Sequence, residues 1–190
     1  MIFEDSIEPE QGVEFSVKDK VVTVKGPKGT VTNNFAHAKN LTIEVDKKTK
    51  KLVVHTEFPT NKELAIAKTI INLIKNMQKG VLHQYTYKMK LVHAHFPITV
   101  VPPQKGSDEI LIKAFIGERS PRKTKVVGDV KVTANKEEVI LVGCNNIHVG
   151  QTAANIQNCA KVRDKDKRVF QDGVFLYEKM LGNDTIWKIR

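Results

Sequence analysis

The sequence is short of the residues that disulfide-bonded and membrane proteins need. Its two cysteines, Cys144 and Cys159, are too few for a disulfide framework in a chain of 190 residues. We therefore expect a reducing compartment, with both thiols buried as small hydrophobic groups. No apolar run reaches about eighteen residues, so neither a membrane-spanning helix nor a membrane partner is expected.

The arrangements of residues that carry catalysis and metal binding are also missing from the sequence. The stretch GPKGT at residues 26–30 lacks the glycine-lysine pair of a phosphate-binding loop. KH domains clamp RNA with a two-glycine loop, but that loop joins two helices, so a hairpin turn is the favoured interpretation here. His93 and His95 share one face of an expected strand without a third ligand. We expect no catalytic residues, metal site, cofactor or small-molecule substrate.

What the chain has in excess is positive charge. Its net charge is +10, of which +3 falls in residues 1–84 and +7 in residues 85–190. Such a surplus favours a polyanionic partner, either nucleic acid or an acidic membrane surface, although a soluble enzyme with a basic pI remains an alternative. Arginine binds phosphate through a planar fork of donors, so the second half is expected to make the main anionic contact. The five arginines all lie there, at positions 119, 122, 163, 168 and 190.

Alternating apolar residues and turn residues predict strands in the first half, at residues 21–24, 30–35, 41–45 and 51–55. A helix is predicted to follow, because Thr60 and Glu63 are spaced as a capping box. Gly80 is expected to end this helix in a left-handed conformation. The predicted apolar stripe of the helix consists of Ile66, Ile70, Leu73 and Met77.

The second half repeats the order of strands and helix. GDVKVTANKEEVILVG, from Gly128, predicts two strands around a turn, and a helical apolar stripe follows at Val149, Ala153, Ile156 and Ala160. The repeated order predicts an α+β fold with two tandem, similar modules, each an antiparallel sheet with a helix packed on one face. The modules are expected to cover residues 1–83 and 84–190, the second being the main binding part.

A long strand is expected at the junction, in QYTYKMKLVHAHF at residues 84–96. Tyr85, Tyr87, Met89 and Leu91 alternate on one face of it, and the apolar positions then shift by one residue. Because a shift of one residue exchanges the two faces of a strand, a bulge or sharp twist is expected near Leu91.

Two clusters of basic residues stand out in the second half. GERSPRKTK at residues 117–125 is expected to form a loop between strands because it contains Gly117 and Pro121. The other cluster lies in AKVRDKDKRVFQDG at residues 160–173. Neither has the apolar face that a membrane-surface helix requires, so loops that follow a phosphate backbone are favoured. The candidate contacts are Arg119, Arg122, Lys123, Lys125, Lys161, Arg163, Lys165, Lys167 and Arg168.

The acidic residues of the second cluster raise the question of a calcium loop. Asp164 and Asp166 have the spacing of its first ligands, but Arg168 and Val169 stand where a further ligand and a glycine are required. We expect instead that the two acids hold neighbouring bases in place, and that Val169 and Phe170 pin the loop to its module. A merely solvated turn is the alternative.

Four stretches together carry a family resemblance: VVTVKGPKGTV at 21–31, YKMKLVHAHFPITV at 87–100, FIGER at 115–119 and HVGQTAANIQ at 148–157. In this order they resemble the universal large-subunit ribosomal protein family numbered six in bacteria and nine in eukaryotes. KDKRVFQDG at 165–173 is similar to the eukaryotic ending of that family. The resemblance implies two α+β modules without catalytic activity, in a cytoplasmic ribosome, after nuclear or nucleolar passage in a eukaryote. It also implies binding to large-subunit ribosomal RNA near the sarcin–ricin loop and the stalk base, beside neighbouring ribosomal proteins.

The leading hypothesis is therefore a structural ribosomal RNA-binding protein. In it, Gln151 and Asn155, one helical turn apart, hydrogen-bond RNA sugars or base edges, although a solvated helix face is an equal alternative. A free regulatory RNA-binding protein is a second hypothesis, but it would use aromatic residues to stack bases, and these are only 6% of the chain. An enzyme on a basic scaffold is the third.

Overall fold

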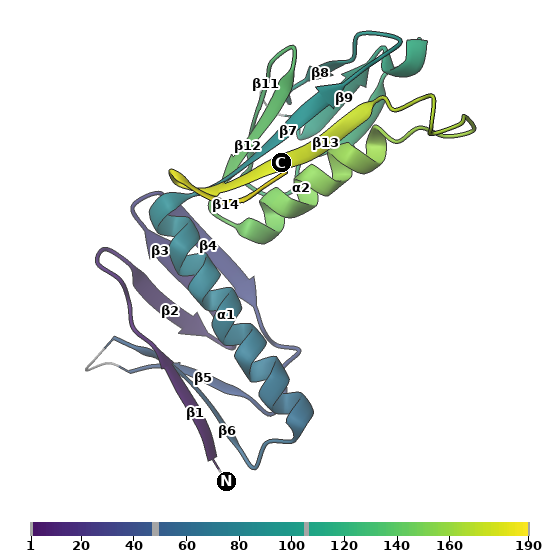
Figure 1. Cartoon of the computed structure of the whole chain (residues 1–190). Coiled ribbons are helices and arrows are strands. Elements are labelled where there is room, and N and C mark those ends of the chain that lie inside the picture. Colours follow the sequence, from purple (N-terminus) through teal and green to yellow (C-terminus); the bar gives the residue numbers. More distant parts are fainter. Residues whose placement is uncertain (1, 47–49, 105–106, 190) are drawn as a thin grey trace. The chain divides into compact units, whose positions relative to one another are not determined.

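The computed structural model describes residues 2–46, 50–104 and 107–189. The chain divides into two compact units, residues 1–83 and 84–190, which are described separately below (Figure 1). The described part of each unit holds one α-helix and two antiparallel sheets. The prediction of an α+β fold built from sheets with packed helices is confirmed, and each unit adds a second sheet to it.

The first unit contains two three-stranded sheets and helix α1 (Asn61–His83). One sheet has the order β2 (Glu14–Lys18), β3 (Val21–Gly26), β4 (Gly29–Asn34), and the other has the order β1 (Ile2–Ile7), β6 (Leu52–Glu57), β5 (Thr42–Val45). Helix α1 packs chiefly against β3, with further contacts to β1 and β4. The four predicted strands are confirmed, whereas β1 and β2 were not predicted, because acidic residues interrupt their apolar alternation.

The two-glycine stretch forms the predicted hairpin turn. Gly26 pairs with Gly29 across β3 and β4, which leaves a two-residue loop. Gly26 also lies directly against α1: a Cβ added there would stand 2.6 Å from Cγ2 and 3.1 Å from the carbonyl oxygen of Val81. The amide of Lys28 donates a hydrogen bond of 3.0 Å to the same carbonyl. The hairpin is thus docked on the helix through its backbone, which is possible only where no side chain intervenes.

Helix α1 begins with the predicted capping box. The Glu63 carboxylate accepts a 2.7 Å hydrogen bond from the Thr60 amide, and the Thr60 hydroxyl accepts one of 3.4 Å from the Glu63 amide. The predicted stripe was partly wrong, because Ile66 is 41% exposed and lies at the edge of the packed face. The buried residues of the helix are Ala67, Ile70, Ile71, Ile74, Met77, Gln78, Gly80 and Val81.

The predicted end of α1 at Gly80 is also wrong. The helix continues to His83, and the left-handed residue after it is Gln84, with φ of 58°. Gly80 lies inside the buried face rather than at a turn. Because Val81 is fully buried against Gly26, one more turn of helix gains apolar burial that a stop at Gly80 would lose.

The second unit is built on a five-stranded antiparallel sheet. Its order is β11 (Lys131–Ala134), β12 (Glu138–Gly143), β7 (Tyr85–Val92), β13 (Gly173–Leu181), β14 (Asp184–Lys188). A smaller sheet has the order β10 (Arg122–Lys125), β9 (Glu109–Lys113), β8 (Thr99–Val101), and a short 3-10 helix spans Phe115–Gly117. Helix α2 (Asn146–Cys159) packs against β7, β12, β13 and β10.

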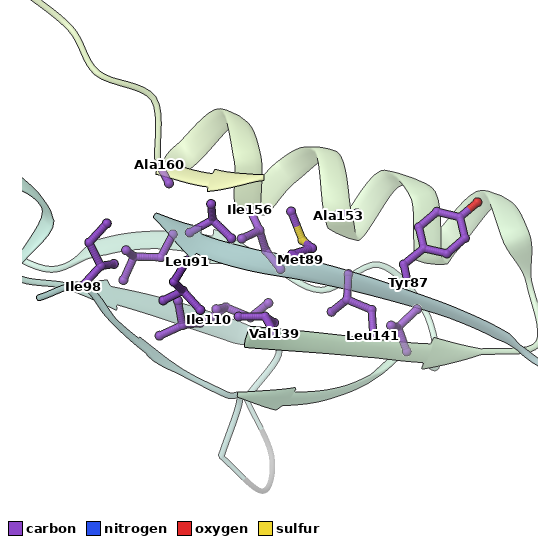
Figure 2. Close-up of a cluster of buried hydrophobic side chains, with 14 of the residues drawn as sticks. Tyr87, Met89, Leu91, Ile98, Ile110, Val139, Leu141, Ala153, Ile156 and Ala160 are labelled. Carbon is purple, nitrogen blue, oxygen red and sulfur yellow. The ribbon is translucent and has the colours of Figure 1, made fainter. Parts of the chain in front are cut away.

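The core of the second unit lies between α2 and the strands. Figure 2 shows Ala153 and Ile156 of α2 and Met89 of β7 pointing into one buried layer. The predicted stripe of α2 is confirmed, because all four of its residues, Val149, Ala153, Ile156 and Ala160, are buried. A 14-residue helix with so few large side chains depends on this packing for its stability.

The junction strand is shorter than the sequence suggested. Tyr85, Tyr87, Met89 and Leu91 are buried on one face of β7, as predicted, but the strand ends at Val92. The apolar shift marks this end rather than a bulge in β7. The irregularity lies in the neighbouring strand β13, where the register with β7 shifts between Leu176 and Glu178. His93 and His95 therefore lie beyond the strand, not on a shared face of it.

Candidate RNA-binding surface

The first basic cluster is a strand for part of its length, not the predicted loop. Residues 122–125 form β10 and pair with β9, so only residues 118–121 lie outside regular structure after the 3-10 helix. Along β10 the exposure alternates, which leaves Lys123 and Lys125 exposed and Arg122 half-buried. Arg119, on the irregular part, is exposed. An edge strand of polar residues gives no apolar alternation, so the sequence pattern could not reveal it.

Arg122 is occupied inside the unit. Its Nε and Nη2 donate hydrogen bonds of 2.8 Å and 2.5 Å to the two carboxylate oxygens of Glu118. Its Nη1 donates bonds of 2.8 Å and 2.9 Å to the carbonyls of Cys159 and Lys161. The guanidinium also lies 4.3 Å from the centre of the Phe115 ring. Four of its bonds thus tie β10 to the segment that leaves α2, which makes Arg122 a positioning residue rather than a free phosphate ligand.

The bond between Arg122 and Glu118 also sets the charge at this point. The hydrogen bonds from Arg122 lower the pKa of the Glu118 carboxyl, partly opposed by desolvation, and the charges of Arg122 and Arg163 lower it further. Both partners therefore stay charged at neutral pH. The influence of Arg163 on this carboxylate indicates that the two basic clusters share one region of the surface.

The second cluster is an extended segment, residues 161–172, without helix or strand. In Figure 1 it extends beyond the end of α2 before the chain returns as β13. Its five basic side chains, Lys161, Arg163, Lys165, Lys167 and Arg168, are all exposed. The fifth arginine of the second half, Arg190, lies outside the described residues.

The acids of this segment shape its backbone more than they pair with its bases. The Asp166 carboxylate accepts a 2.9 Å hydrogen bond from the amide of Arg168, and the Asp166 carbonyl accepts one of 2.9 Å from the amide of Phe170. Asp164 adopts a left-handed conformation with φ of 56°. Such Asx-type turns hold the loop in one form, so the neighbouring bases project from a fixed backbone.

The end of the segment is held by a cluster that sequence analysis missed. Asp172 is 3% exposed, and its carboxylate accepts hydrogen bonds from the amide of Ala94 and, at 2.8 Å, from Nδ1 of His95. The imidazole of His95 in turn stacks on Phe170, with ring centres 4.4 Å apart. The predicted anchoring by Phe170 is correct, but that by Val169 is wrong, because Val169 is 60% exposed.

Burial alone would raise the pKa of Asp172, but the hydrogen bonds from Ala94 and His95 outweigh it, so the pKa lies below the usual value. Asp172 is therefore a buried, charged and satisfied carboxylate that joins the loop to the residues after β7. The HAH and QDG stretches named both partners in the sequence, but nothing in their spacing, about 77 residues apart, indicated a contact.

Gln151 and Asn155 lie on α2 beside β10. The amide of Gln151 donates a 2.9 Å hydrogen bond to Oδ1 of Asn155, whose own amide donates one of 3.3 Å to the carbonyl of Lys125. Asn155 is thereby half-committed to fixing the end of β10, while Gln151 is exposed. The pair therefore borders Lys125, and their remaining donor and acceptor atoms face the same surface.

Other sequence expectations can be placed in the described parts of the chain. Cys144 and Cys159 are free thiols, as expected, but both are half-buried rather than fully buried. Among residues 2–46, 50–104 and 107–189, no three His, Cys, Asp or Glu side chains are grouped to hold a metal ion. None of the described helices has the length and apolar character needed to cross a membrane.

Comparison with known proteins places this surface in a family. The model of the family described as "Ribosomal protein L6" matches residues 11–84. Large ribosomal subunit protein uL6 of Staphylothermus marinus is 43% identical over 175 residues, which cover 92% of this chain and 93% of that protein. The uL6 protein of Methanobrevibacter smithii is 40% identical over 175 residues, 92% of this chain and 95% of its own length. That of Saccharolobus solfataricus is 36% identical over 179 residues, 94% and 96% of the two chains.

Two sheet-and-helix units with a basic surface on the second are thus the architecture of a structural, RNA-associated protein rather than an enzyme. The chain belongs to the uL6 family of large-subunit ribosomal proteins. The family resemblance predicted from the four sequence stretches is confirmed.

Proposed function

We propose that the chain is a constituent of the large ribosomal subunit that binds large-subunit ribosomal RNA near the sarcin–ricin loop and the base of the stalk. The observation that carries the RNA contact is the segment at residues 161–168, where five basic side chains are exposed on a backbone fixed at both ends. The location on the RNA follows from the family resemblance. The second unit makes the main contact, because it holds the larger share of the charge, +7 of +10.

The basic side chains of the loop pair with RNA phosphates. A fixed backbone lowers the entropy that binding must overcome, since the loop need not be ordered at the moment of contact. Arg119, Lys123 and Lys125 extend the contact along the first cluster, and Arg122 holds the two clusters together from within. Gln151 and Asn155 add hydrogen bonds to sugars or base edges beside Lys125. Phosphate contacts of this kind fix position on the RNA without reading its sequence.

The neighbours of the chain in this proposal are other large-subunit proteins, including those of the stalk base. Its place of work is the cytoplasmic ribosome, with passage through the nucleus or nucleolus during assembly if the source is eukaryotic. Support comes from the relatives named above, each of which is a protein of the large ribosomal subunit.

Sedimentation tests the proposal. A lysate of cells that carry the tagged full chain is run through sucrose gradients at moderate and then at high salt. We expect the chain in fractions with large subunits and polysomes, since a fully integrated protein with many phosphate contacts resists moderate salt. A chain found only at the top of both gradients would contradict the proposal and favour a free regulatory RNA-binding protein.

A further inference from the structure

A pocket of about 430 Å³ opens where α2 ends and β13 begins. Its volume falls in the range of small-molecule sites, roughly 300–1,000 Å³. The pocket borders the basic loop, and its lining combines aromatic, amide and basic side chains. The ones that matter here are Gln157, Asn158, Lys161, Lys167, Gln171 and Phe175.

Phe175 provides an accessible aromatic surface. Its side chain is 43% exposed although it lies on a strand of the central sheet. The ring rests on the backbone of Gly173, where an added Cβ would stand 2.7 Å from the ring atom Cζ. The glycine therefore lets the ring lie flat against the strand. The neighbouring Phe170 is less available, because His95 stacks on its ring and Nζ of Lys165 lies 4.9 Å from the ring centre.

The amide groups around the ring still have hydrogen-bonding capacity. Gln157 uses its oxygen to accept a 3.4 Å bond from the amide of Leu176, which leaves its NH₂ group as a donor. Gln171 uses its NH₂ group to donate to the carbonyl of Arg168 at 3.2 Å, which leaves its oxygen as an acceptor. Asn158 is exposed. The pocket thus offers both donors and acceptors, as the edge of a nucleobase does.

Two lysines place positive charge at the same opening. Lys161 and Lys167 both line the pocket and both have exposed side chains. The position of Lys161 is fixed, since its carbonyl accepts the 2.9 Å bond from Arg122. A ring for stacking, amides for an edge and ammonium groups for a phosphate are the three parts with which proteins hold an unpaired nucleotide.

We propose that this pocket binds one unstacked nucleotide of the RNA, with its base on Phe175, its edge on the amides, and its phosphate at Lys161 and Lys167. The inference rests on the proposed function, in which the second unit binds ribosomal RNA. An acidic peptide would satisfy the lysines without using the ring, and a neutral ligand would use the ring without the lysines. A nucleotide uses both.

Fluorine NMR on the full chain labelled with para-fluorophenylalanine tests the pocket directly. The Phe175 resonance is assigned by its loss in Phe175→Leu, and adenosine 5′-monophosphate, ribose 5-phosphate and poly-glutamate are the probes. Stacking predicts a saturable ring-current shift of this resonance with adenosine monophosphate and none with the other two. An equal shift with ribose 5-phosphate or poly-glutamate means an anion site only and overturns the proposal, as does a resonance that adenosine monophosphate leaves unmoved.

Binding to purified large-subunit RNA separates this inference from the function on which it rests. Phe175→Leu should weaken affinity about tenfold, as expected for one lost stacking contact, without changing the salt dependence. Phe58→Leu, which changes an exposed phenylalanine of the first unit, is the matched control and should bind like the wild type. If Phe175→Leu also binds like the wild type, the pocket proposal fails alone. If the wild type binds this RNA no better than poly(A), the proposed function fails.

Discussion

Arg122 and Glu118 are joined by two hydrogen bonds, of 2.8 Å from Nε and 2.5 Å from Nη2. The same guanidinium reaches the carbonyls of Cys159 and Lys161, so one side chain spans β10, the end of α2 and the start of the basic loop. Its planar fork makes this possible, because four acceptors on two sides need donors in fixed directions. A side chain used in this way organises the RNA-binding surface from within.

Replacing Arg122 with Lys should therefore destabilise the second unit, although the charge is kept. An ammonium group cannot reach all four acceptors, and partly buried hydrogen bonds are worth about 1 kcal/mol each, so we expect a loss of about 1–2 kcal/mol. The only tryptophan, Trp187, lies in β14, so its fluorescence during urea unfolding reports on this unit. Arg119→Lys, at an exposed position, is the control. Equal stability of the two variants would show that Arg122 does not hold the segment.

The buried carboxylate of Asp172 should give the second unit a measurable dependence on acid. Its pKa is lowered in the folded state, so its stabilisation is fully present above the unfolded value, about 3.9, and is lost as the pH falls through the folded value. Asp172→Asn should cost about 2 kcal/mol at neutral pH, because hydrogen bonds to a charged group are removed. It should also flatten the decline of stability below about pH 4.

Urea unfolding followed by Trp187 fluorescence, repeated between neutral pH and pH 3, measures both effects of Asp172→Asn. Asp129→Asn removes an exposed carboxyl from the same unit and serves as the control. Parallel pH profiles of the wild type and Asp172→Asn would contradict the role given to this group. Hydrogen exchange should show faster exchange at Ala94 in the variant, since that amide loses its charged acceptor.

In the first unit, Gly26→Ala should separate the hairpin from α1. The new Cβ would meet Cγ2 of Val81 at 2.6 Å and its carbonyl oxygen at 3.1 Å, and the backbone atom cannot move aside without shifting the helix. Overpacking of this kind costs about 1–3 kcal/mol. Far-UV circular dichroism during thermal unfolding monitors α1, the longer of the two described helices. A variant as stable as the wild type would show that the close approach is not required.

Gly150→Ala should have the opposite effect in the second unit. Gly150 lies within α2, and a Cβ there would find only the Tyr87 ring edge, at an ordinary distance of 3.9 Å. Alanine in a helix interior is favoured over glycine by about 0.5–1 kcal/mol. We expect that gain in Trp187-monitored unfolding. A loss of stability instead would mean that α2 cannot accept the methyl group, contrary to the contacts seen here.

The elements that the sequence predicted are those with a strong local pattern. The strands over residues 21–55 and the two helices follow from alternation, periodicity and the capping box at Thr60. Strands β2 and β10 escaped notice because charged residues alternate in them and the pairing with a neighbouring strand holds them in place. The end of α1 was misplaced for a related reason, since burial of Val81 outweighs the tendency of Gly80 to stop a helix.

The candidate site divides in the same way. The exposed bases of residues 161–168 follow from composition and charge alone, because polar loops need no partner. The roles of Arg122 and Asp172 depend on tertiary contacts with residues tens of positions away, and no local pattern encodes those. The sequence named Arg122 as one more phosphate contact, whereas its neighbours in the folded unit make it a support for the others.

The central claim is that the basic loop at residues 161–168 binds ribosomal RNA phosphates, and the salt dependence of binding tests it most directly. The affinity of the full chain for purified large-subunit RNA is measured over a range of salt concentrations. The wild type is compared with a variant in which Arg163, Lys165, Lys167 and Arg168 are changed to Gln. The control changes four exposed lysines of the first unit, Lys18, Lys39, Lys68 and Lys75, to Gln.

Each phosphate contact releases about 0.9 counterions on duplex RNA-like sites, so the slope of log affinity against log salt should become shallower by about three to four in the loop variant. The control variant should keep a slope close to that of the wild type, because its charges lie outside the proposed contact. A loop variant with the slope of the wild type would contradict the account, since it would mean that these four side chains face water in the complex.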